Sequence, residues 1–163
     1  TPQSLGDTLE TQFAYGSNMD PSQLNNKKIK MRNPRVAKLE GYQFAFTKKS
    51  NWDSKLSQAS RINGKANISE NNDSMVWGIL LDLTESEVEK MDDSEGTGSG
   101  HYFRKPVDVI TDSGIVKAIT YVAHDDKLIP NTTPLEWYLN HVLDGAKYPN
   151  LPEDYIESIQ ALG

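Results

Sequence analysis

Residues 75–83 read Met-Val-Trp-Gly-Ile-Leu-Leu-Asp-Leu, an almost wholly apolar stretch. A short apolar run of this kind is typical of a strand buried on both faces, so we expect it at the centre of a sheet. The next residues, Thr84 to Glu87, have the pattern of a capping box, in which the threonine hydroxyl accepts from the backbone and the glutamate reaches back. These signals predict a central strand followed directly by a helix that ends near Asp93.

Strand patterns continue on both sides of this unit. Five further stretches carry the aromatic and β-branched residues or the alternation of strands: 11–15, 35–47, 66–70, 102–111 and 115–124. The last two are separated by Asp112-Ser113-Gly114, where glycine allows the positive φ that hairpin loops often need, so we expect a hairpin. Residues 48–65 show no period and predict a long loop, a kind of segment that often carries function.

Helix signals are fewer. Asp20-Pro21 has the form of an N-cap followed by proline at the first helical position, which predicts a short helix that ends before Asn33-Pro34. Residues 134–143 and 153–162 have apolar residues at helical spacing and predict a C-terminal helical hairpin over 134–162. Since strands dominate the middle and helices the end, the sequence predicts an α+β fold with a mostly antiparallel or mixed, barrel-like sheet.

The composition limits the kinds of protein that this chain can be. Its 163 residues fit one domain over 1–163, with residues 1–10 as a loose lead-in. The 23 acidic residues outnumber the 17 lysines and arginines, which argues against nucleic acid as a partner because phosphate binding needs clustered basic residues. The one basic cluster, Lys27 to Arg32, is interpreted as a solvated helix face.

Other classes are excluded by what the sequence lacks. No apolar run is long enough to cross a bilayer, and residues 1–4 lack signal-peptide features, so we expect no membrane partner and a cytoplasmic location. The absence of cysteine excludes thiolate nucleophiles and cysteine-ligated zinc. His101, His124 and His141 lie in separate segments without metal-site spacing, and no phosphate loop occurs, so we expect neither a metal nor a cofactor.

Two segments can carry chemistry. In the first, residues 13–19, a strand delivers a Gly-Ser-Asn turn directly to the start of a helix. A turn of this kind presents several unpaired backbone N–H groups on one side and can cradle a carboxylate or an oxyanion. An ordinary connection between a strand and a helix has the same pattern, so that alternative stays open.

The second segment, residues 91–100, places three carboxylates at the end of the helix that follows the apolar strand. The helix dipole opposes carboxylates at this end, so they do not stabilise the helix. Glu95, followed by glycines, is expected to turn inward to a partly dry site with a raised pKa and to act as a general base. Asp92 and Asp93 are the fallback candidates, and a solvated acidic loop is the alternative.

Taken together, these segments resemble the γ-glutamylcyclotransferase family of the AIG2-like superfamily, from about Gln12 to Ile159. The blocks that carry the resemblance follow one another in the expected order: Phe13-Ala14-Tyr15-Gly16-Ser17-Asn18, Arg32-Asn33-Pro34, 64–70, Val76-Trp77-Gly78-Ile79 through Met91-Asp92-Asp93-Ser94-Glu95-Gly96, Ser99-Gly100-His101-Tyr102, Thr120-Tyr121-Val122, and Gly145-Ala146-Lys147 with Leu151-Pro152-Glu153-Asp154-Tyr155. One such block is weak evidence, whereas the ordered set is specific.

The resemblance implies a small mixed, largely antiparallel β-barrel with flanking helices, and conversion of γ-glutamyl amides to 5-oxoproline and a free amine. It implies Glu95 as the general acid/base. The substrate site it implies consists of Tyr15, Gly16, Ser17 and Asn18, the backbone of Phe13 and Ala14, and Tyr102 and Tyr121 as wall or hydrogen-bonding residues. The substrate's own α-amine attacks its γ-carbonyl, so no protein nucleophile, metal or cofactor is required.

Several alternatives about the substrate and the assembly stay open. The sequence Tyr-Gly-Ser-Asn favours γ-glutamyl amino acids as substrates. The first alternative is the same ring closure on a γ-glutamyl amine or a secondary metabolite. The second is a non-catalytic module that binds γ-glutamyl groups. We expect residues 48–65 and 125–134, which match nothing distinctive, to select the leaving amine. The expected partner is a small γ-glutamyl molecule. A homodimer is a further option, with Trp137 and Tyr138 as core, dimer surface or lid.

Overall fold

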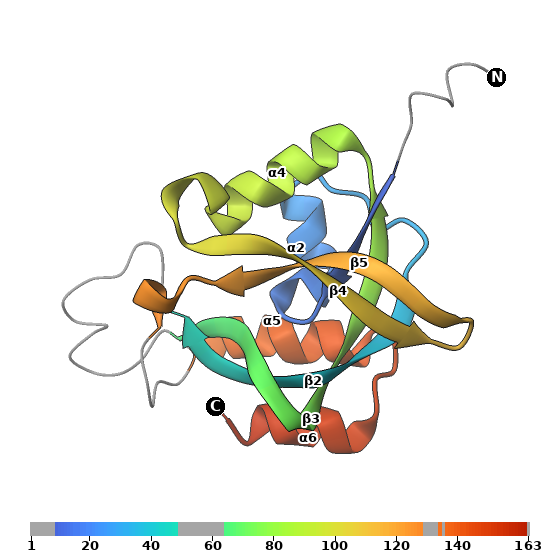
Figure 1. The fold of residues 1–163 in the computed structure, drawn as a ribbon, viewed down its shortest axis with the longest axis vertical. Helices are drawn as coiled ribbons and strands as arrows, with labels where there is room; N and C mark the ends of the chain where they lie inside the picture. Colours follow the sequence, from blue (N-terminus) through green and yellow to red (C-terminus); the bar gives the residue numbers. More distant parts are fainter. Residues whose placement is uncertain (1–8, 49–63, 129–133, 135, 163) are drawn as a thin grey trace.

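The structure, a computed structural model, describes residues 9–48, 64–128, 134 and 136–162. Five strands close into a barrel in the order β1-β3-β2-β4-β5 (Figure 1). Their bounds are β1 Glu10–Ala14, β2 Arg35–Lys48, β3 Lys65–Leu83, β4 Tyr102–Thr111 and β5 Gly114–Ala123. Neighbouring strands are antiparallel except β1 and β5, which run parallel where Gln12 lies opposite Ile119. The predicted α+β fold with a mixed, largely antiparallel barrel is confirmed.

The apolar stretch 75–83 is the second half of one long strand. β3 covers both 66–70 and 75–83, which the sequence presents as two strands, and both halves pair with β2. The register jumps between them: Glu40 lies opposite Met75, whereas Tyr42 lies opposite Glu70. Gly41, with a φ of 85°, takes up this irregularity. The predicted break is therefore a bulge within a continuous strand pair.

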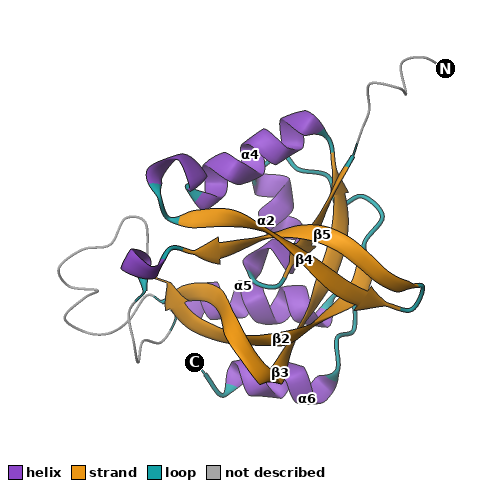
Figure 2. Cartoon of the chain, in the orientation of Figure 1, coloured by secondary structure: helices purple, strands orange, loops and turns teal. Residues whose placement is uncertain are grey.

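Helices cover the barrel on different sides. Their bounds are α2 Pro21–Asn26, α4 Glu85–Glu95, α5 Glu136–Lys147 and α6 Glu153–Gln160, with 3₁₀ turns η1 Ser17–Met19, η2 Thr97–Ser99 and η3 Asp125–Lys127. Figure 2 shows α4 and α6 at opposite ends of the molecule with the strands between them. Within the described residues, no helix combines the length and the apolarity that crossing a bilayer would need.

Some predicted boundaries are wrong. The helix after Asp20-Pro21 ends at Asn26 because Lys28 takes a positive φ of 61°, so the basic cluster from Lys27 to Arg32 is not a helix face. Ile29 within that cluster is buried. Glu10, assigned to the lead-in, is the first residue of β1. Most of the predicted loop over 48–65 and half of the segment 125–134 lie outside the described residues.

The capping box at the start of α4 forms as predicted. Thr84 Oγ1 accepts from the Glu87 backbone N–H at 3.3 Å, and Glu87 Oε1 accepts from the Thr84 N–H at 2.9 Å. Glu87 also pairs with Arg32 Nη1 at 2.7 Å, and these contacts outweigh burial and lower its pKa to about 2. The helix runs two residues beyond Asp93 and ends where Gly96 takes a left-handed φ of 67°. Glu95 is therefore the last residue of α4.

Candidate active site

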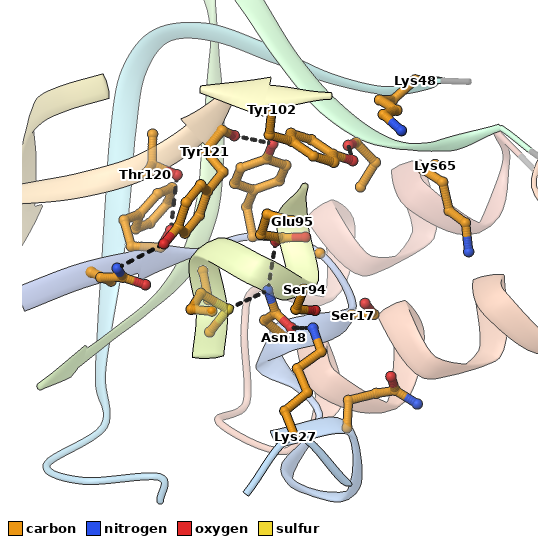
Figure 3. A pocket seen from close by; sticks show the side chains of 18 of the residues that line it. Ser17, Asn18, Lys27, Lys48, Lys65, Ser94, Glu95, Tyr102, Thr120 and Tyr121 are labelled. Carbon is orange, nitrogen blue, oxygen red and sulfur yellow. Dashed lines mark hydrogen bonds between the residues drawn. The ribbon is translucent and has the colours of Figure 1, made fainter. Parts of the chain in front are cut away.

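One cavity of about 240 Å³ collects the residues singled out in the sequence (Figure 3). Its lining includes every predicted site residue: Phe13, Ala14, Tyr15, Gly16, Ser17, Asn18, Glu95, Tyr102 and Tyr121. They come from β1, η1, the end of α4 and the strands β4 and β5, which are far apart in the sequence. The backbone turn and the acidic side chain thus face the same space. Asp92 and Asp93 do not belong to this lining.

The turn at residues 15–19 is held from behind by α5. Met19 is completely buried, and a Cβ added at Gly145 would lie 2.7 Å from both the Met19 Cβ and the Asp20 N. Glycine at position 145 therefore allows the helix to approach the turn this closely. His141 Nδ1, one turn earlier on α5, lies 2.6 Å from Asp20 Oδ2. The first N–H groups of the 3₁₀ turn that begins at Ser17 have no partner within the turn itself.

Glu95 is joined to this turn through Asn18. Asn18 Nδ2 donates to Glu95 Oε1 at 2.9 Å, and Lys27 Nζ donates to Asn18 Oδ1 at 2.5 Å. Because the lysine is a donor only, it fixes the amide oxygen on its own side and turns the amide NH₂ toward the carboxylate. Glu95, which is only partly buried, therefore has one carboxylate oxygen held in a defined position.

Buried tyrosines form the walls. Tyr15 Oη donates to the Tyr121 carbonyl and Tyr102 Oη to the Ala66 carbonyl, both at 2.6 Å, while Tyr138 Oη accepts from the Ala66 N–H at 3.1 Å. Burial raises the pKa of Tyr15 and Tyr102, and raises that of Tyr138 to about 12. These hydroxyls are therefore neutral at physiological pH, and the hydroxyls of Tyr15 and Tyr102 are already engaged with the backbone.

Tyr121 belongs to a second polar network beside the cavity. Its hydroxyl donates to Asp92 Oδ1 at 2.6 Å and accepts from Gln12 Nε2 at 3.1 Å. Asp92 also pairs with Arg104, Nη1 lying 3.2 Å from Oδ1. Burial raises the pKa of Tyr121, and the bond to Asp92 adds to this. Asp92, the fallback candidate, is thus engaged in orienting Tyr121.

The backbone of β1 is already engaged at the positions predicted to contact substrate. Phe13 and Ala14 pair with Leu80 and Ile79 of β3, and the Phe13 carbonyl also accepts from Thr120 Oγ1 at 2.9 Å. Phe13 and Ala14 therefore form part of the cavity wall and position the turn from Tyr15 to Asn18 that follows them.

Five further lining residues were not singled out as site residues: Lys27, Lys48, Lys65, Trp137 and Tyr138. Lys48 and Lys65 are nevertheless the first and last residues of the segment expected to select the leaving amine, and a lid was one of the options for Trp137 and Tyr138. One signal was available for Lys48, because Phe44 and Phe46 precede it at alternate positions and all three are buried. A strand with period two directs such residues to one face. Lys48 Nζ lies 2.9 Å from His101 Nδ1 and over the Tyr102 ring.

Comparison with known proteins agrees with the geometry. The model of the AIG2-like family matches residues 75–159. The chain is 32% identical to a human γ-glutamylcyclotransferase and 30% identical to the mouse protein of the same name, each over 92% of this chain and 77% of the relative. A solved structure named γ-glutamyl cyclotransferase superimposes with a TM-score of 0.74, at 23% identity over 95% of this chain and 88% of the other. With a cavity that unites the expected turn and glutamate, and with relatives of this identity over most of its length, the chain belongs to the γ-glutamylcyclotransferase family of enzymes.

Proposed function

We propose that this enzyme converts a γ-glutamyl amide to 5-oxoproline and a free amine, with Glu95 as the general acid/base. The observation that carries the proposal is the 2.9 Å contact between Glu95 Oε1 and Asn18 Nδ2, which ties the carboxylate to the turn in one cavity. A carboxylate at a fixed place beside a set of backbone donors is what this ring closure needs.

The reaction balances without a co-reactant. The α-amine nitrogen of the γ-glutamyl group attacks its own γ-carbonyl carbon, a C–N bond forms, and the bond from that carbon to the leaving nitrogen breaks. Glu95 takes the proton that the attacking amine loses and returns it to the leaving nitrogen. Because nucleophile and electrophile belong to one molecule, the site has mainly to hold the chain in its folded shape.

The turn Tyr15–Asn18 is the proposed binding site for the negative charge of the substrate. The carbonyl oxygen gains negative charge during attack, and the glutamyl α-carboxylate is negative throughout. Preorganised N–H donors stabilise both, and the start of a helical turn offers them. Asn18 is proposed to orient Glu95, while the rings of Tyr15 and Tyr102 exclude water from the reacting atoms.

The test is to incubate the protein with a panel of γ-glutamyl dipeptides and γ-glutamyl amines and to measure 5-oxoproline by mass spectrometry. We expect Glu95→Gln to lower kcat by about 10²–10⁴-fold, the usual contribution of general acid–base catalysis. Substrate affinity is expected to stay within about tenfold, or about 1.4 kcal/mol. Glu89→Gln, on the exposed side of the same helix, is the matched control and keeps wild-type turnover.

Two results contradict the proposal. Absence of 5-oxoproline from every substrate of the panel leaves the binding module as the better account. Wild-type turnover in Glu95→Gln removes that residue from the mechanism.

A further inference from the structure

Lys65, the first residue of β3, lies in the cavity lining with its ammonium against two aromatic rings. Its Nζ is 4.1 Å from the centroid of the Tyr138 ring and 4.7 Å from that of Trp137. Among the residues that the structure describes, Lys65 forms no ion pair. The other charged residues of the lining differ, since Lys27 and Glu95 contact Asn18 and Lys48 contacts His101.

The half-buried Lys65 ammonium is stabilised by the two aromatic faces but has no carboxylate of the protein beside it in the described residues. A carboxylate of a ligand would therefore add a contact that these rings do not supply. Burial lowers the Lys65 pKa to about 8, with the nearby Lys27 acting in the same direction and Glu95 in the opposite one. The side chain is still mainly protonated at pH 7, so it presents a positive charge to whatever enters the cavity.

The two ends of the cavity differ in exposure. At the closed end, Thr120 and Tyr121 are 0% and 5% exposed, whereas at the open end beside Lys65, Trp137 is 48% exposed. Figure 3 shows Glu95 between Lys65 on one side and Thr120 and Tyr121 on the other. When the scissile amide lies at Glu95 and the γ-glutamyl group occupies the closed end, the leaving amine extends toward the open end and Lys65.

We propose that Lys65 determines specificity by binding a carboxylate of the leaving amine, so that γ-glutamyl substrates with an anionic leaving group are preferred over those with a neutral one. The inference rests on the proposed function, because it assigns the open end to the part of the substrate that is released. The carboxylate is either the α-carboxylate of a leaving amino acid or a carboxylate in its side chain. A guanidinium or ammonium bound to a carboxylate is a strong, charge-assisted contact.

The experiment compares kcat/KM on two matched substrate pairs. γ-Glutamylalanine and γ-glutamylethylamide differ only in the α-carboxylate of the leaving amine, and γ-glutamylglutamate and γ-glutamylglutamine differ in a side-chain carboxylate. The proteins are the wild type, Lys65→Met, Lys65→Arg and Lys117→Met. Lys117 has a side chain that is 90% exposed on β5, and its variant serves as the control for loss of a lysine.

We expect the wild type to prefer the anionic member of at least one pair by about tenfold, which corresponds to about 1.4 kcal/mol. Lys65→Met is expected to reduce that ratio to near one, Lys65→Arg to retain much of it, and Lys117→Met to leave it unchanged. The pair whose ratio collapses identifies the carboxylate that Lys65 binds. Thermal unfolding verifies that Lys65→Met is folded, and we expect no loss of Tm because the substitution removes a poorly solvated charge.

The inference and the proposed function fail in different ways. If the wild type releases 5-oxoproline but Lys65→Met changes neither ratio, the inference is wrong while the proposed function stands. If no substrate yields 5-oxoproline, both are wrong.

Discussion

The closed end of the cavity, with Thr120 and Tyr121, and the open end, with Lys65 and Trp137, differ in how their polar groups are satisfied. At the closed end, both hydroxyls donate hydrogen bonds within the protein, that of Thr120 to the Phe13 carbonyl and that of Tyr121 to Asp92. At the open end, the Lys65 ammonium rests on two rings. On the proposed function, the closed end holds the γ-glutamyl part that all substrates share, whereas the Lys65 ammonium faces the leaving amine, which varies between substrates.

Between the two ends, Asn18 connects the turn to Glu95, and we expect its removal to impair catalysis more than any other change discussed below. In Asn18→Ala, Glu95 loses the donor that holds Oε1, and Lys27 loses its acceptor. A hydrogen bond to a charged group contributes roughly 1.5–3 kcal/mol, so we expect kcat to fall by about 10- to 100-fold. Because this loss concerns the acid and not the open end, the ratio between anionic and neutral leaving groups should not change.

Steady-state kinetics on one substrate pair measures both effects. Asn25→Ala, at an exposed position on α2, is the matched control. A variant at Asn18 that loses selectivity but keeps kcat would mean that the residue serves the open end, contrary to this assignment.

The support behind the turn gives the next largest effect. A Cβ at residue 145 would lie 2.7 Å from Met19 Cβ, so Gly145→Ala forces α5 away from η1. Glycine to alanine ordinarily stabilises a helix by roughly 0.5–1 kcal/mol, but overpacking costs about 1–3 kcal/mol. We therefore expect a net loss of stability in chemical denaturation, together with reduced turnover.

Gly98→Ala is the control for this prediction, because a Cβ at residue 98 would meet nothing within 4 Å. A more stable Gly145→Ala protein would show that the helix can retreat from the turn without cost.

The same contrast explains how much the sequence could predict. The acid and the turn beside it come from segments with strong local signals: the apolar strand 75–83, the capping box at Thr84 and the Gly-Ser-Asn turn. Neighbouring residues alone determine the structure of such segments, and the order of the segments along the chain carries the family resemblance. The structure accordingly brings Glu95 and Asn18 together.

The open end has only a coarse signal. Lys65 ends the stretch 48–65, which was expected to select the leaving amine, but nothing in its neighbours indicates that its ammonium faces a cavity. Lys27 was misassigned for a different reason: residues 27–32 suit a helix face in composition, yet the positive φ at Lys28 ends the helix and directs the chain into the core at Ile29. Both positions depend on tertiary contacts, which a pattern in one sequence does not contain.

We expect a weaker effect of pH, which should change the preference for anionic leaving groups at the open end but not the chemistry at Glu95. With a pKa of about 8 in the free protein, Lys65 loses its proton as the pH rises through that value, and its attraction for a carboxylate is lost. We expect the kcat/KM ratio of γ-glutamylalanine to γ-glutamylethylamide to fall above about pH 8, by at most the factor that Lys65→Met removes. Because kcat/KM reports the free enzyme, the kcat ratio should stay constant to higher pH.

The other groups around Lys65 would not by their own titration make the kcat/KM ratio fall above about pH 8. Tyr138, with a pKa near 12, stays neutral over this range, and Trp137 does not titrate. The charges of Lys27 and Glu95 shift the pKa of Lys65. Their effect on catalysis is the same for both substrates, and so is that of the substrate α-amine, because both substrates share the γ-glutamyl half. In Lys65→Arg the guanidinium keeps its charge, so the ratio should remain flat to about pH 10. A wild-type ratio that is equally flat would assign the anion preference to a cation other than Lys65.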